Sequence, residues 1–554
     1  MNNRISRRQA IIGVSSTLLL PACSSTRSRP DEWSNSVFAH GVASGDPDEQ
    51  SVVIWTRIST AASTVEVEWQ LADDPDFGQI RGSGKLTTGA ERDHTVKVIV
   101  GGLQPGRTYY YRFVSGGRES PTGQTRTLPT GHVEQLVFAI ASCSNFPFGF
   151  FNAYEVIAED DGIDFVVHLG DYIYEYDENG YGGETGRRIG RVHEPRHEIV
   201  SLDDYRTRHA QYKSDTGSLA MHARHPLIAI WDDHESANNP WMEGAQNHQP
   251  GEGDWGTRRA ASLKAWYEWM PVRDPAFGRR PEQYWRHFRF GNLASLITLE
   301  SRHTGRSEQI EWGDVSRFAS PAEAQAFYDE VVGADDRNYL SAQMEDFFTR
   351  SLAESVRAGR RWRIIGNQSV MAKWVMPHLD DPWFDDLLAS LEGPARRTLG
   401  GYMRLGELGV TGDLDAWGGY PIARERFYRL ARNAGAEDLL VISGDSHGFW
   451  ANALHDDEGH SMGVELGTTG ITSPRSVLEL GPETLRRFDE RMMATNDEIV
   501  WTEGRYRGFI RLAIDHDGGR ADYVTVTNIE SREYDTQVIR SARIAAVDGS
   551  LRFT

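Results

Sequence analysis

The chain has 554 residues, of which 39% are hydrophobic, and a formal net charge of −21 at pH 7. This length allows two or more domains with a sizeable core. The acidic balance argues against nucleic-acid binding and against a basic grip on anionic membranes. No segment beyond the N-terminal region is apolar enough to span a membrane.

The first residues have the features of an export signal. Arg7 and Arg8 precede an apolar core at 11–20, which is too short to cross a bilayer. The arginine pair resembles a twin-arginine signal, whose machinery exports folded proteins. LPAC, which ends at Cys23, resembles a lipobox, and the alternative is cleavage near Ala22 to give a soluble periplasmic or secreted protein. We predict a signal over 1–30 and a periplasmic or cell-surface protein that is attached to the membrane only by this lipid.

Residues 31–130 are predicted to form an all-β domain. SVVIWTRI, TVEVEWQL, HTVKVIV and TYYYRFV alternate in polarity and are separated by turns, with no convincing helix between them. Leu103, Pro105 and Tyr109 have the spacing of a tyrosine corner, a feature of immunoglobulin-like sandwiches. We therefore expect an immunoglobulin- or fibronectin-like scaffold beside the rest of the chain, with a binding module as the alternative.

Residues 131–554 are predicted to form an α/β domain, in which apolar strands alternate with amphipathic helices. The helices are expected at 151–160, 258–269, 321–332, 342–358 and 424–434. Five strands end in residues that commonly bind metals: LVFAIA before Cys143, DFVVHLG before Asp171, PLIAIW before Asp232-Asp233-His234, WRIIG before Asn367, and LLVISG before Asp445-Ser446-His447. Because open α/β sheets bind ligands at the carboxyl ends of their strands, these residues predict one shared crevice.

Each motif alone has a plainer explanation. A single Cys143 at a strand end is more often a small core residue. With no disulfide partner left in the mature chain, burial, nucleophilic catalysis in a Cys-His pair and metal ligation are the explanations to weigh. The acidic DDHE stretch is also compatible with a solvated loop. The order of these motifs along one α/β pattern argues against coincidence.

That order resembles the PhoD-like alkaline phosphatases, a branch of the calcineurin-like metallophosphoesterases. SCSN, VVHLGDYIYEY, WDDHESANN, EWMPVR, GGYPIARER and VISGDSHGFW follow in the family's order after an N-terminal stretch FAHGVASGDPDEQSVVIWTR. The resemblance implies a layered metallophosphoesterase sheet sandwich with flanking helices over 131–554. One departure is LESR, where Glu300 stands in place of the expected Asp, so no role is carried over to Glu300 or Arg302.

The resemblance implies ferric iron and calcium as cofactors, and the donor atoms agree with this. Cys143 as thiolate and Tyr174 as phenolate are soft, strong donors that suit Fe(III), with His447 completing the site. Asp171 has two oxygens and can bridge two ions. The oxygen donors Asp233, Asn367 and Asp445 suit Ca²⁺. Asn238 and Asp232 are further ligand candidates, with a supporting role behind the ligands as the alternative.

His234 is the candidate catalytic residue. It stands where related phosphoesterases keep a histidine that contacts the phosphate or protonates the leaving group, and orientation of a metal ligand is the alternative. No side-chain nucleophile is required, because two metals can supply hydroxide and positive charge. Tyr172, Trp374 and Trp450 are candidate aromatics at the substrate rim, although core packing explains them equally well.

These observations predict an exported, metal-dependent hydrolase of phosphodiesters or phosphomonoesters, expected to be a monomer. Its partners would be the phosphate-ester substrate and the twin-arginine machinery. The enzyme alternative is a phosphatase similar to purple acid phosphatases, but the chain lacks the Asn in the DDHE position and the GHxH motif that would support it. The non-enzyme alternative is a surface lipoprotein whose metals are structural. The natural ester is not defined by the sequence.

Overall fold

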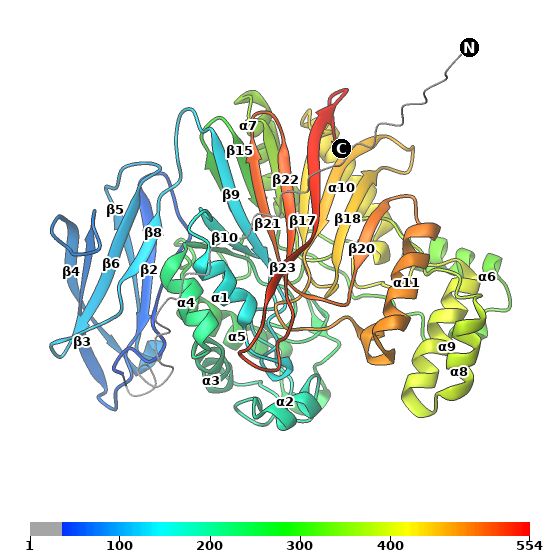
Figure 1. The fold of residues 1–554 in the computed structure, drawn as a ribbon, viewed down its shortest axis with the longest axis horizontal. Helices are drawn as coiled ribbons and strands as arrows, with labels where there is room; N and C mark the ends of the chain where they lie inside the picture. Colours follow the sequence, from blue (N-terminus) through cyan, green and yellow to red (C-terminus); the bar gives the residue numbers. More distant parts are fainter. Residues whose placement is uncertain (1–35) are drawn as a thin grey trace, which may run out of the picture.

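The computed structural model describes residues 36–554, and the predicted signal and Cys23 lie outside this range. Two large β-sheets lie face to face at its centre, and helices surround them (Figure 1). This arrangement confirms the predicted α/β sandwich with a preceding β region. Within the described residues, no helix combines the length and apolar character that a membrane span requires.

The first sheet has ten strands. Its order is β24 (Ser550–Phe553), β23 (Thr536–Val547), β22 (Gly519–Val526), β21 (Arg507–Asp515), β9 (Gln135–Ala141), β10 (Phe165–His168), β11 (Leu227–Ala229), β1 (Val42–Gly45), β2 (Ser51–Arg57) and β5 (Thr95–Gly101). Strands β9, β10 and β11 are parallel, and Val167 pairs with Ile140 on one side and Ile228 on the other. Continuous apolar runs are expected for strands that are covered on both faces. Because the three strands are parallel neighbours, their carboxyl ends lie at one edge of the sheet.

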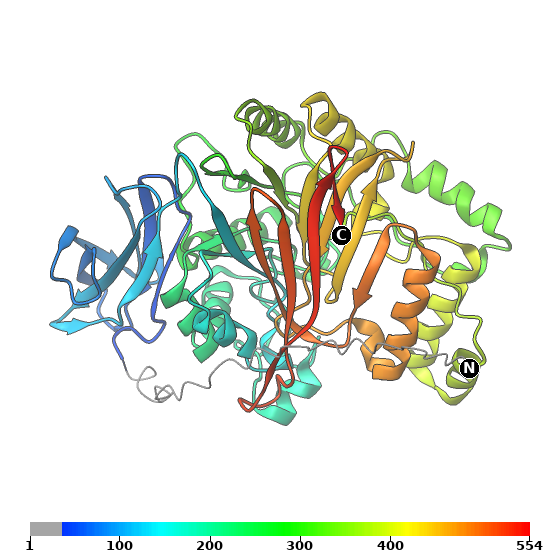
Figure 2. The ribbon, with the colours of Figure 1, turned by 45° about the horizontal axis from the view of Figure 1, so that its top comes forward.

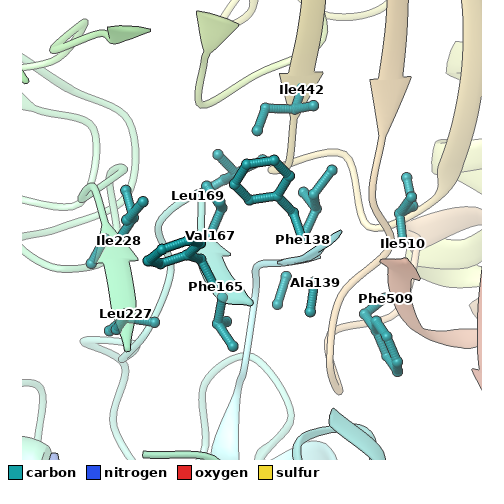
Figure 3. Packing of buried hydrophobic residues seen from close by; sticks show 14 of the residues in the cluster. Phe138, Ala139, Phe165, Val167, Leu169, Leu227, Ile228, Ile442, Phe509 and Ile510 are labelled. Carbon is teal, nitrogen blue, oxygen red and sulfur yellow. The ribbon is translucent and has the colours of Figure 1, made fainter. Parts of the chain in front are cut away.

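The second sheet has seven strands. Its order is β14 (His287–Phe290), β15 (Ala294–Thr298), β16 (Trp362–Gly366), β17 (Leu439–Ser443), β19 (Ser461–Gly467), β18 (Phe449–His455) and β20 (Ile499–Glu503). Strands β15, β16, β17 and β19 are parallel neighbours. Between the sheets, the ring of Phe290 lies 5.3 Å from that of Phe138 and 5.4 Å from that of Phe165. Figure 3 shows Ile442 of β17 directed toward Phe138 and Val167 of the first sheet.

Helices flank the sandwich on its outer faces and at one end (Figure 1). They are α1 (Asn152–Glu159), α2 (Gly183–Ile189), α3 (Leu202–Lys213), α4 (Thr216–Arg224), α5 (Trp255–Trp269), α6 (Pro321–Phe327), α7 (Ala342–Arg357), α8 (Pro382–Ser390), α9 (Gly393–Leu408), α10 (Pro421–Asn433) and α11 (Pro482–Thr495). All five helices expected from the sequence are present; the one expected at 321–332 is α6, followed by a π-helical turn at 328–332. On the second sheet, the rings of Phe348 of α7 and Phe427 of α10 stack on each other at 4.2 Å. Both belong to the hydrophobic cluster that includes the strands of this sheet.

The N-terminal β region is a two-layered sandwich. One layer contains β3 (Thr64–Ala72), β4 (Ile80–Gly89), β6 (Thr108–Ser115), β7 (Arg118–Glu119) and β8 (Gly123–Arg126), and the other is β1, β2 and β5. The hydroxyl of Tyr109 accepts a hydrogen bond of 2.8 Å from the backbone N–H of Gln104, as a tyrosine corner requires. Figures 1 and 2 place this region at one end of the molecule and α8, α9 and α11 at the other.

One layer of this region is part of the central sheet, which the sequence did not indicate. Strand β1 pairs in parallel with β11, with Gly45 opposite Leu227. A Cβ atom on Gly45 would lie 2.5 Å from the Leu227 carbonyl oxygen, so only glycine allows this approach. The expected neighbouring scaffold is therefore joined to the α/β part by backbone pairing. A short hairpin of β12 (Pro240–Trp241) and β13 (Gly244–Ala245) completes the strands.

A lysine that has no acidic partner among residues 36–554 is buried where this region meets α3 and α4. The side chain of Lys213 is 2.9 Å from His222 Nε2 and lies over the ring of Trp55 at 5.1 Å. Burial lowers the pKa of Lys213 well below its usual value. Burial also lowers the pKa values of the neighbouring His209 and His222, so both rings are neutral. Neither can act as a counter-ion for a charged Lys213.

We predict that Lys213→Met stabilises the protein at pH 7. The unfolded chain binds the proton more tightly, so the free energy of unfolding falls as pH drops from about 10.4 toward the folded-state pKa. Each pKa unit of difference is worth about 1.4 kcal/mol at pH values below both pKa values. Thermal unfolding measured from pH 7 to 10.5 should show that the variant is more stable than the wild type, and that this difference shrinks at high pH. Lys85→Met, at an exposed lysine paired with Glu66, should change little; an equal gain there would contradict the explanation.

Candidate active site

Turns from both sheets meet at one end of the sandwich. A Cβ on Gly170, after β10, would lie 2.4 Å from the Cβ of Asp232, after β11. A Cβ on Gly444, after β17, would lie 2.7 Å from the hydroxyl of Ser142, after β9. These two glycines therefore allow four strand ends from two sheets to approach closely. The sequence had suggested one shared crevice at the strand ends, and the structure forms it from strands of both sheets.

Several candidate residues have a strained backbone in these turns. The φ angles of Cys143, Asp171, Asp445 and His447 are 58°, 56°, 60° and 57°. The left-handed region costs a non-glycine residue about 1–3 kcal/mol and is concentrated at functional sites. Each turn is held by other contacts; for example, the backbone N–H of Cys143 donates to the Gly170 carbonyl at 3.2 Å. The strain directs these side chains toward one centre.

The first donor group contains Cys143, Asp171, Tyr174 and His447. One donor atom each from Cys143, Asp171 and His447 lie within 4.8 Å of one another. The Tyr174 hydroxyl is 3.0 Å from Asp171 Oδ2 and 3.3 Å from His447 Nε2. The Nδ1 of His447 is 3.0 Å from the Pro474 carbonyl, which can only accept. His447 Nδ1 is therefore the protonated nitrogen, and the Nε2 lone pair is directed toward the group.

Without a bound cation, the surroundings of this group disfavour deprotonation of its thiol and its phenol. Burial, together with the negative charge of Asp171, raises the pKa values of the Cys143 thiol and the Tyr174 hydroxyl well above their usual ranges. Burial lowers the pKa of His447 to about 3, so its ring is neutral. A thiolate at Cys143 therefore needs a bound cation, which argues against a free nucleophilic cysteine.

The second donor group contains Asp171, Asp232, Asp233 and Asp445, whose oxygens also lie within 4.8 Å of one another. Asp171 Oδ1, Asp232 Oδ2 and Asp233 Oδ1 are buried and lack a hydrogen-bond partner among the described residues. Burial raises the pKa of Asp232 to about 6, although the Arg302 guanidinium lies 2.5 Å away. Buried carboxylate oxygens without partners are costly unless a cation binds them. The residues therefore fit the binding of cations at both donor groups, which have Asp171 in common.

His234 is oriented by a carboxylate that the sequence analysis missed. Its Nδ1 lies 2.7 Å from Glu175 Oε2, and its ring stacks on Tyr174 at 4.2 Å. Its Nε2 lies 3.8 Å from Asp233 Oδ2, on the side of the donor groups. Although burial opposes its charged form, Asp233 and Glu175 raise the pKa of His234 well above its usual value. Nε2–H can therefore donate a proton toward the site.

A second missed carboxylate fixes the turns. Glu235 is fully buried and accepts hydrogen bonds from the backbone N–H groups of Asp171 at 3.0 Å, Tyr172 at 2.6 Å and Asp232 at 2.8 Å. It thereby joins the turn after β10 to the turn after β11. Glu175 and Glu235 lie inside GDYIYEY and WDDHE, but only the tertiary contacts distinguish their roles from those of other acidic residues.

Two predicted ligands are engaged elsewhere. The carboxamide of Asn367 donates to the Ser369 carbonyl and accepts a hydrogen bond of 3.2 Å from Trp417 Nε1. Asn238 contacts the Tyr176 hydroxyl at 3.1 Å and lines the cleft beside the donor groups. Neither side chain makes a hydrogen bond with the clustered carboxylates within the described part of the chain.

Other sequence candidates are separated by their burial and contacts. Trp374 and Trp450 line the cleft, whereas Tyr172 is buried and its hydroxyl contacts Ser218 and His222, so the rim interpretation was wrong for Tyr172. Glu300 accepts hydrogen bonds from three consecutive backbone N–H groups, at 302, 303 and 304, and so shapes its own turn.

The donor groups open into a cleft of about 420 Å³. Its lining includes Asp233, His234, Asp445 and His447 together with aromatic and aliphatic side chains. Arg302, buried beneath the cleft, pairs with Asp232 and with Asp415 at 2.6 Å. The arrangement combines clustered acidic and soft donors with a histidine that can carry a proton, which is the chemistry of metal-assisted ester hydrolysis.

Comparisons with known proteins place most of the described chain in one family. The PhoD-like phosphatase family matches residues 138–523, and the PhoD-like phosphatase N-terminal domain matches residues 22–129. Alkaline phosphatase D of Bacillus subtilis (strain 168) is 33% identical over 506 residues, covering 89% of this chain and 78% of that protein. A solved structure titled Structure of PhoD superimposes with a TM-score of 0.76 at 30% identity, covering 94% of this chain and 92% of that one.

Fold and sequence together define a phosphoric ester hydrolase. The chain belongs to the PhoD-like phosphatase family, which confirms the resemblance noted from the sequence.

Proposed function

We propose that this enzyme hydrolyses phosphodiesters or phosphomonoesters with the help of bound metal ions. The observation that carries the proposal is the convergence of two donor groups on Asp171, with buried carboxylate oxygens that lack partners among the described residues. When bound, two metal ions would supply a hydroxide nucleophile and positive charge toward the phosphoryl oxygens.

The chain's own residues would place and protonate the ester. His234, oriented by Glu175 through Nδ1, would donate the Nε2 proton to the leaving oxygen. Glu235 would hold the turns that carry Asp171 and Asp232. Arg302, which pairs with Asp232 and Asp415, would keep those carboxylates in place beneath the cleft.

We propose Fe(III) and Ca²⁺ as the two kinds of metal ion. Sulfur, phenol and imidazole donors at Cys143, Tyr174 and His447 favour Fe(III), and the carboxylates Asp233 and Asp445 favour Ca²⁺. Asn367 and Asn238 remain candidate oxygen ligands; Asn367 would have to exchange its contact with Trp417 for an ion.

The test is turnover of bis(p-nitrophenyl) phosphate and p-nitrophenyl phosphate before and after chelation. We expect purified protein to hydrolyse at least one of them, to lose most of the activity in EDTA, and to regain it with added Ca²⁺. Chelator-resistant turnover would overturn the metal-dependent mechanism. A surface binding protein with structural metals would give no chelator-sensitive turnover at all.

We also propose that the enzyme is exported and attached to the membrane through lipid on Cys23, a residue outside the described structure. The support is the arginine pair and lipobox-like LPAC in the sequence. Wild-type protein should partition with membranes, and Cys23→Ala should release it or leave it unprocessed. Recovery of all wild-type protein in the soluble periplasm would exclude the lipid attachment.

A further inference from the structure

The catalytic cleft has an apolar half that the proposed chemistry does not use. This apolar half is defined by six lining side chains that belong to one hydrophobic cluster: Val370, Met376, Trp450, Val477, Phe488 and Met492. The one cation beside these side chains, within the described residues lining the cleft, is Arg475, which pairs with Asp489 at 2.6 Å and lies over Trp450. Its charge is therefore already compensated. A phosphoryl group needs the polar half alone, so the apolar half is available to another part of the substrate.

Trp374 limits this apolar half. A second cavity of about 400 Å³, lined partly by Tyr328, Val410 and Ile422, lies on another side of Trp374. Trp374 is the single residue that lines both cavities in the described part of the chain. Removal of its indole group would therefore connect them.

The position of Trp374 is fixed from several directions. On either side of it, the backbone N–H of Lys373 donates to Glu498 at 2.6 Å, and that of Val375 donates to Asn496 at 2.7 Å. A Cβ on Gly412 would lie 3.3 Å from the Trp374 ring and 2.3 Å from the Met376 methyl carbon, so the chain passes closely behind both side chains. The wall is therefore held by its surroundings, as specificity-determining residues generally are.

We propose that the natural substrate carries an apolar ester group, which occupies the apolar half of the cleft, and that Trp374 sets the length of that group. This inference rests on the proposed function, because the polar half must bind the phosphoryl group. Burial of apolar surface favours the longer ester by about fourfold per fully enclosed methylene group. The ester group can extend from the cleft into the second cavity only when the indole is removed.

The test uses methyl, hexyl and decyl p-nitrophenyl phosphate below their micelle-forming concentrations. All three release the same p-nitrophenol, so the leaving group is constant and only the second ester group changes. For the wild type we expect kcat/KM to rise at least about tenfold from methyl to hexyl, with no further gain for decyl. Equal values for methyl and hexyl would overturn the inference alone. Failure to hydrolyse any of the three, with p-nitrophenyl phosphate still hydrolysed, would also overturn the inference alone. Failure on all four substrates would overturn the proposed function and the inference with it.

The variants test Trp374 itself. We expect Trp374→Ala to raise the decyl-to-hexyl ratio of kcat/KM at least about fivefold, because the second cavity then accepts the additional methylenes. Trp383→Ala is the matched control: Trp383 is 39% exposed on α8 and lines neither cavity. Trp374→Phe should give a smaller rise and serves if the alanine variant does not fold. An unchanged ratio in a folded Trp374 variant would overturn its role.

Discussion

Replacement of Cys143 by alanine is expected to remove iron, visible colour and most activity. The thiol is buried within 4.8 Å of donor atoms from Asp171 and His447, and only a cation can keep it deprotonated there. Loss of an outer-shell partner of a metal ligand typically costs about 10–100-fold, so loss of the ligand itself should exceed this range. Metal analysis, visible absorption and turnover measure the three effects, and circular dichroism should show a retained fold.

A pair of tyrosines provides the matched control for this prediction. The Tyr174 hydroxyl lies 3.0 Å from Asp171 Oδ2, whereas Tyr181 contacts the opposite nitrogen, His447 Nδ1, at 3.2 Å. Tyr174→Phe should therefore bleach or shift the phenolate-to-iron charge-transfer band, and Tyr181→Phe should keep it. The metal-ligand role would be contradicted by a wild type that is colourless and iron-free, whose Cys143 is rapidly alkylated and whose activity is unaffected by chelators. Cys143 would then be a nucleophile.

The strands and the donor residues were predictable from the sequence because both signals are local. An apolar run such as LVFAIA followed at once by a polar turn marks a strand and the side chains at its end. Cys143, Asp171 and Asp445 could be placed at strand ends in this way. Which strand belongs to which of the two sheets could not be predicted from local pattern, because it depends on pairing between segments far apart in sequence.

Buried polar helices were the main omission. Helix α3 buries Tyr205, Arg208 and His209, so its inward face carries no apolar periodicity to recognise. Arg208, for example, is fully buried and donates to backbone carbonyls, including those of Glu194 and Pro195. Such a side chain can be assigned to the interior only after its partners are known.

The residues that support the site were missed for the same reason. Glu175 and Glu235 accept hydrogen bonds from residues about 60 positions away, so no spacing in the sequence distinguishes them from surface carboxylates. Asn367 shows the converse: its place after a strand suggested a ligand, yet its carboxamide contacts Trp417 in the structure. Local pattern indicates which residues reach the site, whereas their orientation depends on distant neighbours.

His234→Asn is expected to slow hydrolysis of esters with poor leaving groups far more than that of p-nitrophenyl esters. General acid–base catalysis contributes about 10²–10⁴-fold, and p-nitrophenolate leaves without needing a proton. The structure supports this role because Glu175 holds Nδ1 at 2.7 Å, so that the other nitrogen can donate on the side of the donor groups.

The result is separable from a structural effect of the substitution. Glu175→Gln keeps the shape of the His234 partner but removes one of the charges that, with Asp233, raise the His234 pKa. For poor leaving groups, the fall in rate on the alkaline side of the pH–rate profile should therefore begin at a lower pH. The loss of rate should be smaller at low pH, where His234 is still protonated. Equal losses for alkyl and nitrophenyl esters in His234→Asn, with metal content unchanged, would show that His234 binds the phosphoryl group and does not protonate the leaving oxygen. Lower metal content would instead place His234 among the ligands, because one of its ring nitrogens lies within 4.8 Å of carboxylate oxygens of Asp171 and Asp233.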